Sequence, residues 1–159
     1  MTKVMIVYFS KTGNTAKLAE AIAFGASEAG AEVVLKPVSA AKPVEMLDYD
    51  VIIAGSPTYY GHSAGVLRTF FDESVCVHGR LNGKIGGAFA TSAYKSGGNE
   101  TTILDILHAF MVHGMVVKGQ HSKDHYGPTS INTPTEIDIK DAKNYGAMLV
   151  NLAKRISNV

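Results

Sequence analysis

The segment from Ser10 to Thr15 contains the residue types that bind a phosphate group. It follows an apolar stretch over residues 4–9 and leads directly into a helical pattern, so its backbone would form the first turn of a helix. Amides in that turn have no acceptor within the helix, the helix dipole favours an anion beside them, and a glycine lets the backbone approach closely. The candidate phosphate ligands are Ser10, Lys11, Thr12, Gly13, Asn14 and Thr15, three of which add hydroxyl donors. An ordinary capped turn with no ligand would prefer the same residue types.

Two further loops carry aromatic and hydroxyl residues where predicted strands end. One follows the strand expected over residues 51–55, and the other follows the strand expected over residues 85–91. Ligands of open parallel sheets bind beyond the carboxyl ends of the strands, so both loops should lie beside the phosphate loop. The residues concerned are Pro57, Thr58, Tyr59, Tyr60, Gly61, Thr91, Ser92, Ala93, Tyr94, Gly97 and Gly98. Tyrosine rings can stack on a flat ligand and free amides can bond its edge, so the three loops predict a ligand with a phosphate at one end and a flat ring at the other.

Several other chemistries are excluded by the positions of their key residues. The nucleotide-binding patterns Gly-x-x-x-x-Gly-Lys-Ser/Thr and Gly-x-Gly-x-x-Gly are absent from the sequence. Asp48 and Asp50 precede the third strand, whereas a phosphoacceptor site needs its aspartates at the carboxyl ends of strands. Cys76 follows the second helix and is too far from the first loop to serve as a phosphatase nucleophile. The two histidines in residues 121–125 share no helical face and have no evident third ligand, so we expect no metal site.

Short β-rich runs alternate with helical periods, which predicts βαβ units and a parallel sheet covered on both faces. Strands are expected near residues 3–9, 32–37, 51–55, 85–91 and 115–118. Helices are expected near residues 14–29, 64–74, 99–113 and 139–156, the second with Val66, Leu67, Phe70 and Phe71 as its buried stripe. Residues 39–44 and 119–138 are expected to be loops, so one helix of a complete doubly wound domain would be missing.

Composition sets limits on size and partners. With 159 residues, 46% of them hydrophobic, the chain can fill one core but is short for two ordinary domains. Its formal net charge of +1 provides no basic field for nucleic acid. A single cysteine, no leader-like segment and no apolar run of membrane length predict a cytoplasmic protein that does not insert into membranes.

The three loops resemble those of the flavodoxin-fold proteins that bind FMN. Residues 10–15 resemble the phosphate loop of that family, and residues 57–61 and 91–98 resemble its two ring-binding loops. The resemblance implies one FMN-binding α/β domain over residues 1–159. It also implies a doubly wound, five-stranded parallel sheet of order 2-1-3-4-5 with helices on both faces.

A more specific similarity is to the flavodoxin-like NAD(P)H:quinone oxidoreductases. It rests on Gly55–Thr58, Gly97–Thr102, His113–Met115 and Tyr126–Gly127. This similarity implies a ping-pong enzyme in which NAD(P)H passes a hydride to flavin N5 and leaves before a quinone accepts two electrons at the same site. It places His113 near the flavin pocket as a catalytic candidate and Tyr126 in a loop at the entrance, and it allows a homo-oligomer.

A flavodoxin-type low-potential electron carrier is the alternative. The Tyr60–Gly61 peptide resembles the one that turns to accept a bond from flavin N5, which would stabilise the semiquinone of an FMN carrier serving a redox protein partner. The near-neutral charge and the Gly97–Thr102 run favour the enzyme, because carrier flavodoxins are strongly acidic and lack that run.

Thr12 and Cys76 stand where quinone reductases carry aromatic residues, and the segment after the second strand is shorter than theirs. The substrate residues are therefore not carried over. A cofactor-free interaction module would not need three ligand-shaped loops.

Overall fold

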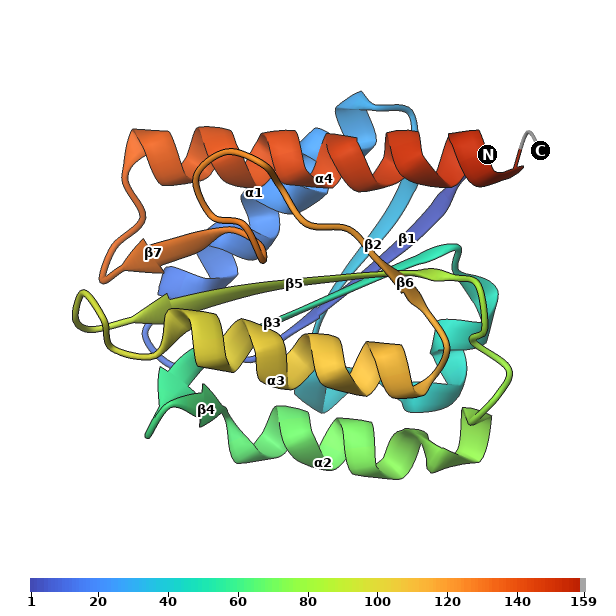
Figure 1. Ribbon diagram of the computed structural model, residues 1–159, viewed down its shortest axis with the longest axis horizontal. Coiled ribbons are helices and arrows are strands. Elements are labelled where there is room, and N and C mark those ends of the chain that lie inside the picture. Colours follow the sequence, from blue (N-terminus) through green and yellow to red (C-terminus); the bar gives the residue numbers. More distant parts are fainter. Residues whose placement is uncertain (158–159) are drawn as a thin grey trace.

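Parallel strands form the central layer of the computed structural model, which describes residues 1–157 (Figure 1). The main strands are β1 (Lys3–Tyr8), β2 (Glu32–Pro37), β3 (Val51–Tyr59), β5 (Ile85–Ser92) and β6 (Val116–Val117). They lie in the order β2-β1-β3-β5-β6 and every neighbouring pair is parallel. Numbered among themselves along the chain, these five strands have the order 2-1-3-4-5, which confirms the prediction.

Helices cover both faces of the sheet. Helices α1 (Asn14–Glu28) and α4 (Glu136–Ser157) lie on one face, and α2 (Gly65–Glu73) and α3 (Asn99–Val112) lie on the other (Figure 1). Successive residues of β1 alternate between two cores: Val4 and Ile6 pack with α1 and α4, whereas Met5 and Val7 pack with α2 and α3. None of the helices in residues 1–157 is long and apolar enough to cross a membrane.

Two short strands lie in segments that were predicted to be loops. Strand β4 (His62–Ser63) pairs antiparallel with the end of β3, so β3 runs on to Tyr59 instead of stopping near Gly55. Strand β7 (Thr129–Ile131) pairs parallel with the end of β5. Both strands lie next to the loops expected to bind the ligand, and both therefore shape that edge of the sheet.

Helix α4 begins at Glu136, before the predicted start near residue 139. The reason is a reciprocal cap at its first turn. The backbone N–H and the hydroxyl of Thr135 donate to the Asp138 carboxylate at 2.8 and 2.9 Å, and the Asp138 N–H donates back to the Thr135 hydroxyl at 3.3 Å. This Thr-x-x-Asp pair satisfies amides that would otherwise lack an acceptor, and it fixes the start of the helix.

The connection from β2 to β3 contains no α-helix, as predicted. It consists of two 3-10 segments, η1 (Val38–Ala40) and η2 (Pro43–Asp48), and a third, η3 (Ser74–Val77), follows α2. An ion pair between Lys36 and Glu45 joins the end of β2 to η2. The α2 face of the sheet is thus covered beside β2 by short turns alone.

A buried tyrosine fills a gap in the hydrogen bonding of β5. Strand β6 pairs with residues 85–86 and β7 with residues 90–92, which leaves the middle of this edge without a partner strand. There the N–H of Ala88 donates to the hydroxyl of Tyr145 from α4 at 3.1 Å. Burial raises the pKa of Tyr145 to about 12, so the hydroxyl stays neutral. Gly127 crosses the same gap, where a Cβ would collide with the Ala88 carbonyl oxygen.

Candidate functional site

The phosphate loop lies between β1 and α1. Gly13 precedes the helix with φ of +95°, a left-handed conformation that favours glycine. The Ser10 hydroxyl oxygen accepts the N–H groups of Gly13 and Ala16, both at 3.2 Å. Across residues 1–157, the amides of Asn14 and Thr15 have no acceptor. These two donors at the start of α1 are therefore available to an anion.

The side chain of Thr15 joins the phosphate loop to the end of β5. Its hydroxyl lies 2.8 Å from the hydroxyl of Thr91, and both side chains are buried. A pair of buried hydroxyls in contact fixes the distance between the two chain segments, because either group left alone would lose its hydrogen bond. The structure thus brings the first and third predicted loops together.

The second loop is a tight β-hairpin. Residues 58–59 of β3 pair with residues 62–63 of β4, and Tyr60 and Gly61 form the turn between them. Their φ angles are +51° and +81°, so both turn residues are left-handed, as in a type I′ turn. Tyr60 is fully exposed, whereas Tyr59 is partly covered.

Side chains of α3 anchor this hairpin. The N–H of Ser63 donates to the Asp105 carboxylate at 3.2 Å, and the Ser63 hydroxyl donates to the same carboxylate oxygen. One turn earlier on α3, the Thr102 hydroxyl donates to the Thr58 hydroxyl at 3.0 Å. Both strands of the hairpin are therefore attached to one rigid element. Asp105 and Thr102 were not predicted as site residues, although their spacing of three places them on one face of a helix that follows the third loop.

The third loop connects β5 to α3 and packs against the hairpin. The Ser92 hydroxyl and the Gly97 N–H both donate to the Tyr94 carbonyl oxygen, at 3.0 and 2.9 Å. Gly98 precedes α3 with φ of +106°, and a Cβ at this position would come within 3.0 Å of the Gly61 Cα. The side chain of Tyr94 is 76% exposed. The second and third loops are therefore in direct contact, with exposed tyrosines on each.

An asparagine after β7 supports the third loop from the other side. The N–H of Asn132 donates to the Ser92 carbonyl oxygen at 2.8 Å, and its side-chain amide donates to the Ala93 carbonyl oxygen at 3.1 Å. The sequence analysis did not identify Asn132. A usable signal was present, because a β-rich triplet at residues 129–131 is bounded by a proline and an Asn-Thr-Pro turn.

At the left of Figure 1, the carboxyl ends of β1, β3 and β5 meet the amino ends of α1 and α3. The phosphate loop offers backbone donors. The other two loops offer exposed tyrosine side chains, and their backbones lie in close contact with each other. These features fit a ligand with a phosphate and a flat ring: the first turn of α1 has amides without acceptors, and glycines stand where a Cβ would crowd the loops.

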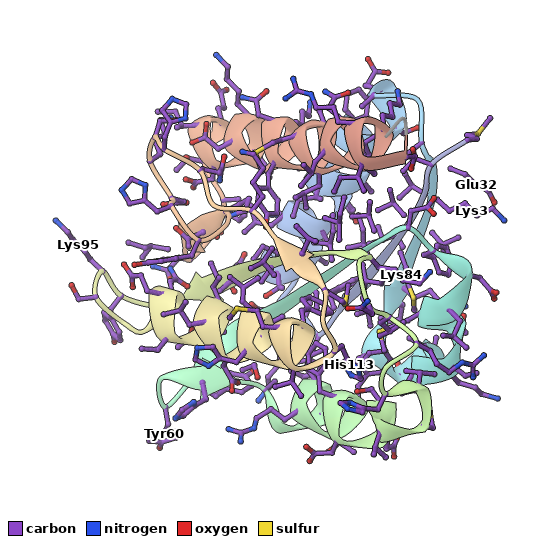
Figure 2. The ribbon with its side chains drawn as sticks, turned by 45° about the vertical axis from the view of Figure 1, so that its right-hand side comes forward. Lys3, Glu32, Tyr60, Lys84, Lys95 and His113 are labelled. Carbon is purple, nitrogen blue, oxygen red and sulfur yellow. The ribbon has the colours of Figure 1, made fainter. Side chains whose placement is uncertain are left out.

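Within this chain, His113 lies away from the three loops, and its catalytic role stays a prediction. It follows α3, whose 14 residues carry it about 20 Å from the third loop. Figure 2 shows Tyr60 and Lys95 on one side of the molecule and His113 well away from them. Its Nε2 lies 2.7 Å from the Ser74 hydroxyl. Burial lowers the pKa of His113, and the nearby His78 lowers it further.

Tyr126 lies beside the first turns of α3. It is partly exposed and lines a small cavity of about 120 Å³ together with Glu100 and Ile103. None of the three predicted ligand loops lines that cavity. Residues 1–157 also contain no group of three or more His, Cys, Asp or Glu side chains placed to hold a metal ion.

Comparison with known protein families gives a match over most of the chain. The matching family is described as a flavodoxin domain and covers residues 5–121. A protein of Archaeoglobus fulgidus named NAD(P)H dehydrogenase (quinone) is 32% identical, over 98% of this chain and 100% of its own. A protein of the same name from Sinorhizobium fredii is 35% identical, over 99% of this chain and 100% of its own.

Solved structures with the same arrangement also match along nearly their whole length. The crystal structure of a WrbA-like flavodoxin from Agrobacterium tumefaciens has a TM-score of 0.84 and 26% identity, and the match covers 98% of this chain and 99% of that one. A flavodoxin from the domain Archaea has a TM-score of 0.81 and 28% identity, with 96% and 99% covered.

Proposed function

The chain belongs to the flavodoxin family, and from this premise we propose that residues 1–159 form one FMN-binding domain that acts as an NAD(P)H:quinone oxidoreductase. The observation that carries the proposal is the meeting of the three loops, with the Thr15 and Thr91 hydroxyls 2.8 Å apart and Gly98 packed against Gly61. The reaction is taken from relatives that are named for it and match this chain from end to end.

The phosphate loop and the hairpin would bind opposite ends of FMN. When bound, FMN supplies the ring that takes a hydride from NAD(P)H and then reduces a quinone by two electrons. The amides of Asn14 and Thr15 would hold the phosphate, supported by the hydroxyl of Ser10. Backbone N–H groups near Ala93 would face the pyrimidine end of the ring and stabilise negative charge there.

Exposed tyrosines leave one approach to the ring site open. Tyr60 is fully exposed and Tyr94 is 76% exposed, so neither side chain is packed into the protein where the ring would lie. A nicotinamide and, after it leaves, a quinone could occupy the space between these side chains in turn. One substrate site used twice is the arrangement that a ping-pong reaction requires.

An electron carrier is the second candidate, and the hairpin turn is the observation that favours it. Gly61 can change its backbone conformation at little cost, and the Tyr60–Gly61 peptide lies where it could respond to the redox state of a bound flavin. Against this, both strands of the hairpin are bonded to α3 through Thr102 and Asp105. The formal net charge of +1 also gives the chain no net negative charge with which to attract a basic redox protein partner.

An anaerobic reaction in two stages tests the proposal. Protein loaded with FMN is mixed with NADH or NADPH, and the flavin absorbance near the visible maximum is followed before and after a quinone is added. We expect rapid loss of the absorbance and its return with the quinone. If neither nucleotide bleaches the flavin and photoreduction gives a long-lived one-electron-reduced form, the carrier is supported and the proposal is refuted.

A further inference from the structure

A cavity of about 530 Å³ lies next to the phosphate loop. Ser10 and Gly13 of the phosphate loop line one end. The other walls come from Tyr8 and Phe9 at the end of β1, from Ala16 of α1, from the end of β2 with the η1 segment and Ala41, and from α2. No residue of the hairpin turn or of the third loop contributes to it. The cavity is therefore a neighbour of the phosphate site and separate from the predicted ring site.

The cavity exists because the connection after β2 is short. No α-helix follows β2, and the 3-10 segment η1 covers only part of the adjacent face of α2. Val66 of α2 was predicted to be buried with Leu67 and Phe70, but it is 51% exposed and lines the cavity instead. The curated relatives align over 190 and 199 positions, which exceeds the 159 residues of this chain.

The walls of the cavity suit a flat, weakly polar ring. Phe9, Val38 and Phe70 provide apolar surface, and Thr69 and Glu73 of α2 add a hydroxyl and a carboxylate. A carboxylate can accept hydrogen bonds from an exocyclic amino group or from ribose hydroxyls. The volume lies within the roughly 300–1,000 Å³ of small-molecule sites. Adenine attached to ribose combines a flat ring, an amino group and hydroxyls.

The position of the cavity indicates how such a group would arrive. Ser10 and Gly13 border both the cavity and the amides proposed to bind the flavin phosphate. A second phosphate linked to the first would pass along these residues and place an attached nucleoside in the cavity. The ring of Phe9, which lines the cavity, packs edge-on against Tyr59 of the hairpin, with centroids 6.4 Å apart.

We propose that this cavity binds the adenosine group of an adenine dinucleotide, an inference that rests on the proposed function. Two molecules could supply that group: FAD bound in place of FMN, or the NAD(P)H that reduces the flavin. Contiguity with the phosphate loop favours FAD, since its pyrophosphate begins at the phosphate that the loop holds. The same wall residues would contact adenosine in either case.

The first arm of the test compares FMN and FAD on protein stripped of flavin. Dissociation constants are measured from the quenching of flavin fluorescence for the wild type and for Val66→Trp, which fills the cavity from its exposed wall. Arg68→Trp is the matched control, because Arg68 is exposed on the same helix and does not line the cavity. We expect Val66→Trp to weaken FAD by at least about tenfold, while FMN and the control change little.

The second arm uses the protein loaded with FMN. The KM for NADH is compared with the KM for reduced nicotinamide mononucleotide, which lacks the adenosine. If Val66→Trp raises only the KM for NADH and leaves FAD binding unchanged, the adenosine comes from the nicotinamide cofactor. Ala41→Phe enters the cavity from the η1 side and repeats both arms should Val66→Trp fail to fold.

The inference is overturned if the cavity-filling variants change neither the preference between FAD and FMN nor the preference between NADH and its truncated form. Failure of the proposed function gives a different result. In that case the wild-type protein retains neither flavin, and the inference is refuted together with the function on which it rests.

Discussion

Replacing Gly13 with valine would place a β-branched residue in the left-handed backbone conformation that begins α1. The φ angle there is +95°, and no atom lies within 4 Å of the position of an added Cβ. The added Cβ therefore meets no steric obstacle, and the strain to be considered is that of the backbone. The loop must either keep this strained conformation or rotate toward negative φ, and rotation would turn the neighbouring amides of Asn14 and Thr15 away from the anion.

Each of these two responses has an expected magnitude. A left-handed residue other than glycine costs roughly 1–2 kcal/mol, which would lower Tm by about 2–8 °C in a domain of this size. Hydrogen bonds from amides to a charged group contribute roughly 1.5–3 kcal/mol each. Loss of one of them to the phosphate would weaken FMN binding by about 10- to 100-fold. Binding of riboflavin, which has no phosphate, should change far less.

Gly79→Val is the control, because Gly79 has φ of +78° and also has open space around it. It lies in the segment between η3 and β5, at the opposite edge of the sheet from the phosphate loop. Thermal unfolding and FMN titration of both variants separate strain from ligand binding. We expect similar losses in Tm and a loss of FMN affinity only for Gly13→Val. Equal FMN affinity in the two variants would refute the placement of the phosphate.

Three further predictions concern the elements that support the site. Tyr145→Phe removes the acceptor of the buried Ala88 N–H, so we expect the free energy of unfolding in urea to fall by about 1–3 kcal/mol; an unchanged transition midpoint would contradict this role. Asp105→Ala releases Ser63 from α3, so it should lower the free energy of unfolding by about 1.5–3 kcal/mol and shift the absorbance of bound FMN. Asp105→Asn keeps one acceptor and should lower the free energy of unfolding less. An identical flavin spectrum in the wild type and both variants would argue against a hairpin held from α3. Burial lowers the pKa of His113 from 6.5, so the unfolded chain binds a proton more readily than the folded protein does. The free energy of unfolding should therefore fall as the pH drops below about 6.5 toward the pKa of the folded state. His113→Gln should flatten this dependence of Tm on pH, and the same slope in both proteins would show that other groups cause it.

The main strands and the three loops could be predicted because each depends on a strong local pattern. The apolar runs of β1, β3 and β5 are buried, and each is followed by hydroxyl, glycine or aromatic residues that are typical of a loop. The order 2-1-3-4-5 came from the family resemblance rather than from those patterns. The parallel pairing of β1 with both β2 and β3 confirms it.

The details missed by the sequence analysis depend on contacts between distant segments. Strands β4 and β7 have two and three residues, too few for a period of two to be visible. The hairpin turn has tyrosine at its first left-handed position, where asparagine or glycine is the usual signal. The distance of His113 from the three loops follows from the length of α3, because a helix of 14 residues spans the sheet from one end to the other.

The most direct test of a flavin held by the three loops is a map of backbone amide shifts in the flavin-free protein titrated with FMN and, separately, with riboflavin. The account predicts that both ligands shift amides in residues 57–61 and 91–98. It also predicts that the difference between the two ligands is concentrated at residues 11–15, where the phosphate would lie. Shifts centred around His113, or no difference at the start of α1, would contradict it.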